Sequence, residues 1–437
     1  MRNPLLLIAN YGKSSLVKNS MVYVITDGIN NAIPFVLLPF ISRYLTPADY
    51  GIVSNFNVLI QVLSVFVYLA SAGIIPVMFF KTDKEDLKAY VSNMLALNTI
   101  VSLICLLIIF LFSKPLNDGL GFSLLYQIFA VICVWFTSIA YLNLVLWRCE
   151  ESPLKFGLFQ ISQSTINALT TVLLVIVLLL SWQGRVYSMF LSGVIMGIIS
   201  LYVLYKRGYL VFHISQKHMM KIIIFGLPLI PHALSFWFKS GANKLLLSNM
   251  CGLSDNGLYS VAMTWGAVVS ICITAFSNSY SPWLFKRLAT FDKDKEGTLF
   301  EQIKLVKMIW LSLILIFVLV GIVYLISYYL TYVIYPQSYY GSLEYLPMIM
   351  IGQAFSGGYI LFVCFCHYTL NTKVLGAITF SISILQVLFS YILIKVSGPV
   401  GVAYSSALAS ALTFFFVSFY SMRVYKLPWL YFKKDFV

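Results

Sequence analysis

Three charged side chains stand inside long apolar stretches of the sequence, namely Asp27, Lys239 and Lys244. A charge near the centre of a membrane-spanning helix costs roughly 2.5–3.5 kcal/mol on insertion scales, so such residues usually face a polar interior and mark the path of a substrate or an ion. Carboxylates on such paths take part in proton or sodium movement, and lysines bind anions as point charges. These residues therefore predict a polar cavity within a membrane protein.

Asp27 lies near the middle of the first apolar stretch. Asn30 and Asn31 follow it at helical i+3 and i+4 spacing. Pro34 and Pro39 come next, and each removes a helical hydrogen bond. We expect Asp27 and Asn31 to line a cavity wall beside a kink, with Asp27 coupling transport to an ion gradient. The alternative is that Asp27 pairs with a lysine only to hold two helices together.

A second polar set recurs on one face of a later predicted helix. His232, Ser235, Lys239 and Asn243 follow one another at i, i+3, i+7 and i+11. We expect this face to line the cavity, because Lys239 lies too deep for its ammonium group to reach the membrane surface easily. Lys244 lies nearer the surface, where it either lines the cavity or extends to the interface. His232 is either a proton-responsive group or a neutral packing histidine.

The composition places these residues in a membrane domain. Of the 437 residues, 60% are hydrophobic and 10% are charged, whereas soluble domains are roughly 25% charged. Each apolar stretch is close to the roughly 20 residues that cross a bilayer as a helix. We therefore predict an all-α integral membrane protein of about twelve transmembrane helices. The predicted spans are 17–41, 52–78, 89–112, 122–146, 157–180, 187–205, 222–247, 258–284, 305–333, 344–367, 374–395 and 401–424.

The basic residues predict the orientation. Most of the 29 Lys and Arg residues fall on the side of both termini, and the opposite side holds only Arg43, Lys114, Arg185 and Lys395. The positive-inside rule therefore places both termini in the cytoplasm. This distribution also explains the net charge of +14 without a nucleic-acid partner. The first apolar run is too short for a signal peptide, so we expect the first span to stay uncleaved.

A basic linker divides the chain into two halves. Residues 206–221 separate six predicted spans in 1–205 from six in 222–424, and 425–437 form a cytoplasmic tail. The sequence reads DYGIVS from Asp49 after the first span and DNGLYS from Asp255 after the seventh. Because both segments follow a span that runs outward, we predict two six-helix bundles related as parallel repeats.

The sequence lacks the usual motifs of enzymes and metal sites. It has no GxSxG elbow, no phosphate-binding glycine loop and no HExxH. Cys364, Cys366 and His367 are close in sequence, but neighbouring helical residues point in different directions and no second ligand pair exists. We therefore expect no catalytic residue, no metal and no cofactor, with transport coupled instead to H⁺ or Na⁺.

Several segments carry a family resemblance. Residues 38–51 read LPFISRYLTPADYG, and the second half contains GLP at 226–228, Asn243-Lys244 and GLYS at 257–260. With the twelve-span layout, these segments resemble bacterial polysaccharide repeat-unit flippases, the O-antigen and capsule transporters of the Wzx type. Those proteins belong to the superfamily of multidrug, oligosaccharidyl-lipid and polysaccharide exporters. Members often have Asp-Arg where this chain has Asn243-Lys244, so one carboxylate is missing here.

The resemblance implies two bundles around a central, partly cationic cavity that opens to each side of the bacterial inner membrane in turn. The implied cargo is an undecaprenyl-diphosphate-linked oligosaccharide, moved from the cytoplasmic to the external leaflet for O-antigen, capsule or lipopolysaccharide synthesis. Lys239, Lys244 and Asn243 are then candidate cargo contacts, together with His232 and with Asn31 and Arg43 of the first half. The implied partners are membrane lipids, a glycan polymerase and other polysaccharide assembly proteins.

Two other functions remain open at this stage. A multidrug or metabolite cation antiporter can have the same architecture, but it needs a carboxylate cluster, whereas the buried charge here is net positive. A membrane glycan polymerase or glycosyltransferase needs a sizeable external loop, and every predicted external connection is short.

The charge distribution yields a testable topology. In a cysteine-free background, membrane-impermeant thiol reagents should label Ser215→Cys and Asp292→Cys from the cytoplasm, and Gly119→Cys and Ser338→Cys from outside. Labelling of Gly119→Cys and Asp292→Cys from the same side would contradict the twelve-span arrangement.

Overall fold

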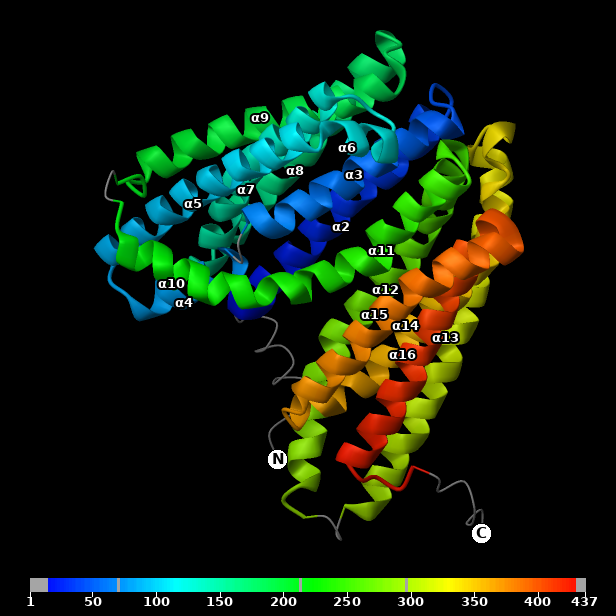
Figure 1. Ribbon diagram of the computed structural model, residues 1–437. Helices are drawn as coiled ribbons and strands as arrows, with labels where there is room; N and C mark the ends of the chain where they lie inside the picture. The colour runs from blue at the N-terminus through cyan, green and yellow to red at the C-terminus, as the bar shows by residue number, and fades with distance from the viewer. Residues whose placement is uncertain (1–14, 69–70, 212–213, 295–297, 430–437) are drawn as a thin grey trace. The chain divides into compact units, whose positions relative to one another are not determined.

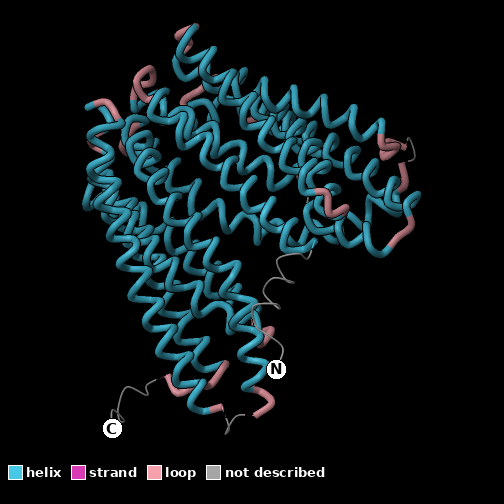
Figure 2. The backbone as a smooth tube through the Cα atoms, turned by 180° about the vertical axis from the view of Figure 1, so that it is seen from behind, coloured by secondary structure: helices cyan, strands magenta, loops and turns pink. Residues whose placement is uncertain are grey.

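The structure is a computed structural model that describes residues 15–68, 71–211, 214–294 and 298–429. Within these ranges the regular structure is entirely helical (Figure 2). Nine helical segments of the described chain are long and apolar enough to cross a membrane, and the last, Lys373–Val424, contains two helices. The predicted all-α membrane fold is confirmed.

The chain forms two compact units, Met1–Trp237 and Phe238–Val437. The helices of unit 1 are coloured from blue to green in Figure 1. They are α2 (Ser15–Ile41), α3 (Pro47–Val67), α4 (Ser71–Lys81), α5 (Lys84–Leu111), α6 (Ser113–Leu120), α7 (Leu124–Cys149), α8 (Pro153–Thr171), the π-helix η1 (Val172–Val177), α9 (Ser181–Lys206), α10 (Gln216–Gly226) and η2 (Leu227–Leu229). The central helix is α7, which packs against α3, α5 and α9, while α2 packs against α8.

Unit 2 begins inside α11 (Ile230–Met250). Its other helices are α12 (Leu253–Phe291), α13 (Leu299–Ile334), η3 (Gln337–Tyr339), α14 (Ser342–Tyr368), α15 (Thr372–Ser397), η4 (Gly398–Val400) and α16 (Gly401–Val424). The central helix is α14, which packs against α12, α13 and α16. Close packing depends on small residues here, because a Cβ on Gly357 or Gly358 would lie within 3 Å of a side chain of a neighbouring helix.

Each of the twelve predicted spans lies on a helix or on a run of helices. The second span comprises α3 and α4, and the seventh comprises α10, η2 and α11, with Pro228 in η2. The predicted spans 258–284 and 305–333 leave residues 285–304 as a connection, and this needs correction, because α12 continues to Phe291 and α13 begins at Leu299. At 1.5 Å per residue, the 39 residues of α12 measure roughly 58 Å, about twice the hydrocarbon thickness. Both helices therefore extend beyond the bilayer as helices.

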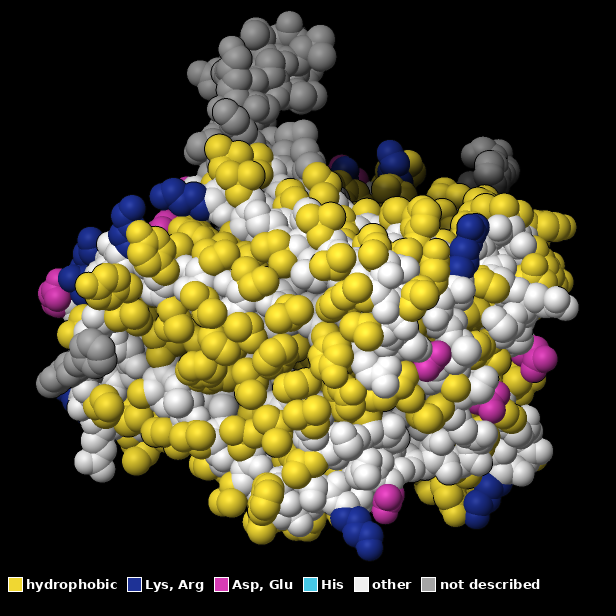
Figure 3. Space-filling view, turned by 90° about the horizontal axis from the view of Figure 1, so that it is seen from above, with side chains coloured by type: hydrophobic (Ala, Val, Ile, Leu, Met, Phe, Trp, Pro, Cys, Tyr) yellow, Lys and Arg dark blue, Asp and Glu magenta, His cyan; other side chains and the backbone are white. Residues whose placement is uncertain are grey.

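Large apolar side chains cover much of the surface. Figure 3 shows a face on which hydrophobic side chains predominate and charged ones are few. On α13, Leu311, Ile314, Leu315 and Val318 are each more than half exposed. Water would make such a patch costly, whereas lipid chains cover it without penalty. The surface therefore fits a bilayer.

The chain after α9 is attached to unit 1. Arg207 forms an ion pair with Glu150, and Ser92 Oγ donates to the carbonyl of Tyr209 at 2.9 Å. Burial and the nearby Glu150 carboxylate raise the pKa of Tyr209, which keeps its hydroxyl protonated as a donor to that carboxylate. Because α10 then packs against α4 and α5, the boundary between the units falls beyond the linker 206–221.

The two segments that resemble each other in sequence both lie at the start of a helix, with an aspartate in the first turn. Thr46 caps α3 and forms a capping box with Asp49, the third residue of that helix. Asp255 is likewise the third residue of α12, and its carboxylate accepts from the Tyr345 hydroxyl at 3.0 Å. A carboxylate in the first turn is stabilised by the positive end of the helix dipole. The feature that the two segments share is therefore a position at a helix start.

Candidate functional site

Unit 1 contains a polar cluster around one cation. Arg185 Nη1 donates to Asn167 Oδ1 at 2.7 Å, Thr171 Oγ1 at 2.8 Å and Ser188 Oγ at 3.2 Å. Asn167 Nδ2 in turn donates to Ser192 Oγ at 2.9 Å. Arg185 is half-buried, and no ion pair forms between it and a carboxylate in the described chain. These hydroxyls and amides fix the guanidinium group without neutralising its charge.

The face of α8 that carries Asn167 and Thr171 extends the unit 1 cluster along the helix. Gln160, Ser164, Asn167 and Thr171 recur at i, i+4, i+7 and i+11, so they share one side of the helix. Ser164 Oγ donates to Asn30 Oδ1 on α2. The buried amide oxygen of Gln160 has no hydrogen-bond partner among the described residues. A buried oxygen without a partner costs free energy, so this face offers an acceptor to a polar ligand.

Irregular backbone adjoins the unit 1 cluster. After Thr171, α8 continues as the π-helix η1, which ends at Val177. Positive φ angles follow at Leu179 and at Ser181, the first residue of α9. Short π-helical turns are uncommon and occur frequently at functional sites. The irregular turn sets the register in which α9 brings Arg185 onto α8.

Unit 2 contains a second polar cluster. Asn243 is fully buried; its Nδ2 donates to Ser406 Oγ on α16 at 3.0 Å and its Oδ1 accepts from Ser390 Oγ on α15 at 2.7 Å. Gln386 Nε2 donates to the backbone carbonyl of Lys239 at 3.0 Å. The cluster thereby joins α11 to α15 and α16.

Lys239 and Lys244 are the cations of α11. Both are half-buried, and neither forms an ion pair with a described residue. The Asn243 and Gln386 hydrogen bonds fix the stretch of helix from which both lysines extend. Unit 2, like unit 1, therefore combines a polar hydrogen-bond network with cations that lack a carboxylate partner in the described chain.

Of the other predicted site residues, Arg43 is the one whose side chain the structure describes. Arg43 is exposed in the turn after α2. The side chains of Asp27, Asn31 and His232 lie outside the described residues. Within the described ranges, no group of three or more His, Cys, Asp or Glu side chains could hold a metal ion.

Arg185 is the functional candidate that the sequence reasoning missed. We predicted the sixth span to begin at residue 187, so Arg185 counted as an external loop residue. The helix begins instead at Ser181, which brings Arg185 inside it. The signal available in the sequence was the row of amides and hydroxyls on the preceding predicted span, at Gln160 and Asn167.

Removal of the Asn243 amide should destabilise unit 2. Asn243→Ala leaves Ser390 and Ser406 without their partner, at a cost of about 1–2 kcal/mol. We expect the melting temperature of the purified protein in detergent to fall by roughly 2–4 °C for each kcal/mol. Asn249→Ala is the control, because Asn249 is exposed on the same helix and donates to the Leu245 carbonyl. Equal melting temperatures of the two variants would contradict this role of Asn243.

The fold is shared with solved membrane transporters. A multidrug resistance transporter of the MATE family, in its inward-facing conformation, matches with a TM-score of 0.70 at 15% identity, over 92% of this chain and 98% of that one. The lipid II flippase MurJ, in an inward closed conformation, matches with a TM-score of 0.70 at 13% identity, over 92% of this chain and 87% of that one. At these identities, the likeness establishes the fold alone.

The sequence comparisons establish the family. A protein of the Lsg locus of Haemophilus influenzae is 25% identical over 368 residues, which cover 82% of this chain and 86% of that protein. A membrane protein of the same organism is 23% identical over 279 residues, which cover 63% of this chain and 66% of that protein. Residues 16–287 match the family described as polysaccharide biosynthesis protein. The chain has the helical membrane fold of the solved transporters described above and belongs to the polysaccharide biosynthesis protein family.

Proposed function

We propose that this protein is a transporter, a flippase that moves an undecaprenyl-diphosphate-linked oligosaccharide repeat unit from the cytoplasmic to the external leaflet of the bacterial inner membrane. The observation that carries the proposal is the presence of cations without carboxylate partners in the described parts of both units. Arg185 stands in α9 of unit 1, and Lys239 and Lys244 stand in α11 of unit 2. The family membership points to the same class of cargo.

These three cations match the diphosphate, which is the part of the cargo that is hardest to move through a membrane. A diphosphate loses its hydration when it enters a membrane domain, and fixed cations replace that hydration with charge-assisted hydrogen bonds. Arg185 offers a planar donor group held in place by its neighbours, whereas the two lysines offer point charges on flexible stems. A cation antiporter would instead need carboxylates where these three residues stand.

The sugar groups of the cargo need uncharged partners. Amides and hydroxyls supply both donors and acceptors to sugar hydroxyls, and α8 presents Gln160, Ser164 and Asn167 on one face. The Gln160 oxygen is the clearest acceptor, because it lacks a partner among the described residues. In this proposal Asn243 does not contact the cargo. Its amide is hydrogen-bonded within unit 2 and supports α11, the helix that carries Lys239 and Lys244.

Ion coupling and downstream partners complete the proposal. Asp27 titrates or binds sodium as the cavity changes access, which weakens the cationic site and releases the cargo outside. A glycan polymerase and other assembly proteins then use the released lipid-linked repeat unit. Both termini lie in the cytoplasm in this arrangement, as the distribution of basic residues predicts.

Substitution of the three cations that lack an ion-pair partner among the described residues should slow flipping. In proteoliposomes loaded with a fluorescent undecaprenyl-diphosphate disaccharide, Arg185→Ala, Lys239→Ala and Lys244→Ala should each reduce the flipping rate at least about tenfold, because each removes a charge-assisted hydrogen bond worth roughly 1.5–3 kcal/mol. Lys239→Arg should retain part of the rate, since the charge survives and the geometry changes. Lys155→Ala is the control, because Lys155 is exposed at the start of α8. Normal flipping by all three alanine variants would rule out the cationic site.

Asp27→Asn separates coupling from a purely structural role. The amide keeps the shape of the side chain and removes its titratable charge. We expect the variant to fold and to bind the cargo, but to lose the acceleration that an imposed H⁺ or Na⁺ gradient gives the wild type. A less stable variant with an intact gradient response would instead assign Asp27 to helix packing.

A further inference from the structure

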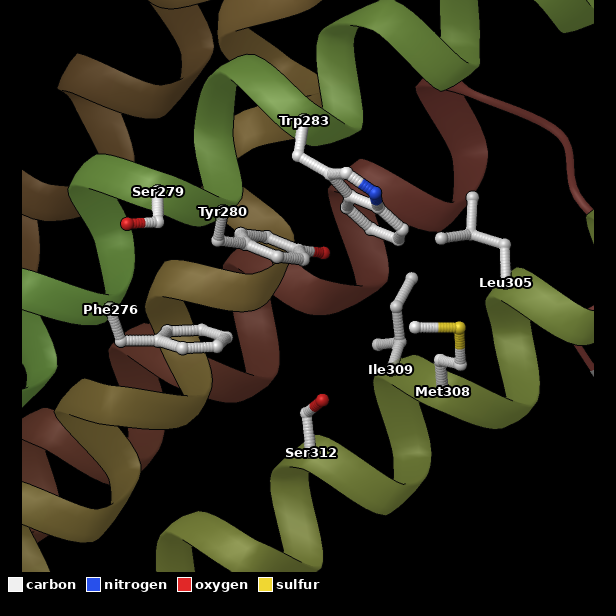
Figure 4. A pocket seen from close by; sticks show the side chains of 8 residues that line it. All are labelled: Phe276, Ser279, Tyr280, Trp283, Leu305, Met308, Ile309 and Ser312. Atoms are coloured by element: carbon white, nitrogen blue, oxygen red, sulfur yellow. The ribbon is translucent and has the colours of Figure 1, made fainter. Parts of the chain in front are cut away.

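A groove separates α12 and α13 within unit 2. Figure 4 shows side chains of the two helices pointing toward one another across it. The groove has a volume of about 330 Å³ and is lined by Phe276, Ser279, Tyr280 and Trp283 of α12 and by Leu305, Met308, Ile309 and Ser312 of α13. Each set follows i, i+3, i+4 and i+7 spacing, so one continuous face of each helix borders the groove. The lining is mainly aromatic and aliphatic.

Contacts at its floor and at one end fix the shape of the groove. Both helices pack against α14, and the Tyr280 hydroxyl donates to the Leu361 carbonyl of α14 at 3.1 Å. At the basic end of the unit, Arg287 Nη1 pairs with Glu301 Oε2 at 3.1 Å and so joins α12 to α13. The Arg287 guanidinium also lies 5.5 Å from the centre of the Trp283 ring. The helices are therefore tied together at their charged ends and separated by the groove beyond.

The charge at this end of the groove is net positive. Lys286 and Lys304 are exposed beside the Arg287–Glu301 pair, and neither forms an ion pair with a described residue. Lys304 precedes Met308 by one helical turn, so it lies on the side of α13 that borders the groove. The distance from Lys304 to Ser312 along the helix is roughly 12 Å. An elongated apolar site with cations at one end matches a lipid chain attached to an anionic headgroup.

We propose that the α12/α13 groove is a binding site for an anionic phospholipid of the bilayer. One hydrocarbon chain lies along Trp283, Met308 and Ile309, and the headgroup phosphate is bound by Lys304 and Arg287. Glu301 holds Arg287 across the groove and repels a second anion, so the site takes one lipid. This site is separate from the cations of α11, and it does not depend on the identity of the transported glycan.

The test uses the tryptophan inside the groove. Protein is reconstituted with phosphatidylglycerol or phosphatidylcholine that carries brominated acyl chains, which quench indole fluorescence on contact. The signal of Trp283 is the difference between the wild type and Trp283→Phe. We expect brominated phosphatidylglycerol to reach half-maximal quenching of Trp283 at a mole fraction at least about threefold lower than brominated phosphatidylcholine, a difference of roughly 0.6 kcal/mol.

Matched variants separate the headgroup from the chain. Lys304→Gln should abolish the preference for phosphatidylglycerol, whereas Lys373→Gln, at an exposed lysine of α15, should keep it. Ser312→Phe fills the groove and should abolish quenching of Trp283 by either lipid. Leu311→Phe adds the same ring to an exposed neighbouring position of α13 and should leave quenching unchanged.

Two results would overturn the proposal. Equal quenching of Trp283 by the two phospholipids would show that bulk lipid fills the groove without regard to its headgroup. Displacement of brominated phosphatidylglycerol from Trp283 by stoichiometric undecaprenyl diphosphate would assign the groove to the cargo tail. Retention of phosphatidylglycerol under those conditions supports the phospholipid site, whatever the flipping assay shows.

Discussion

Hydrocarbon offers no hydrogen-bond partner to a polar group, and this constraint decides what each polar side chain in the membrane helices can do. The Asn243 amide finds its hydrogen-bond partners within unit 2, in Ser390 and Ser406. The Arg185 guanidinium group in unit 1 donates to neutral acceptors such as Asn167 and Thr171. Neutral acceptors hold a guanidinium group in place and leave its charge to act on a ligand. Both networks therefore join helices within their unit, and the one around Arg185 leaves a positive charge available.

The fold could be predicted because a bilayer imposes a length on every apolar helix. All twelve predicted spans coincide with helices, since a long apolar run has no other stable backbone in lipid. Their ends were less predictable. Hydropathy falls where Lys286 and Lys304 appear, but a charged residue does not end a helix, and α12 and α13 continue past these positions. Hydropathy locates the edge of the membrane, whereas helix ends depend on local backbone and capping contacts.

The site could be predicted only where a charge interrupts an apolar run. Lys239 and Lys244 were found for that reason, whereas Arg185 lay at the edge of a run and two of its partners, Asn167 and Thr171, lie on a different helix. Helical periodicity grouped Asn243 with Lys239 on one face, but only the packing shows that α15 and α16 use the Asn243 amide. Contacts between helices distant in the sequence leave no local pattern, so the role of such residues follows from the structure alone.

The two proposals assign exposed cations and half-buried cations to different anions. The bilayer is rich in lipids with a single phosphate, and any exposed cation, such as Lys304 at the end of α13, is available to them. Arg185, Lys239 and Lys244 are half-buried in helices, where an anion must lose its hydration before it binds. A diphosphate carries more charge to offset that loss than a single phosphate does, and its attached sugars add hydrogen bonds to groups such as Gln160. On this reasoning, exposed cations select membrane phospholipid at the helix ends, and desolvation at the inner cations selects the cargo.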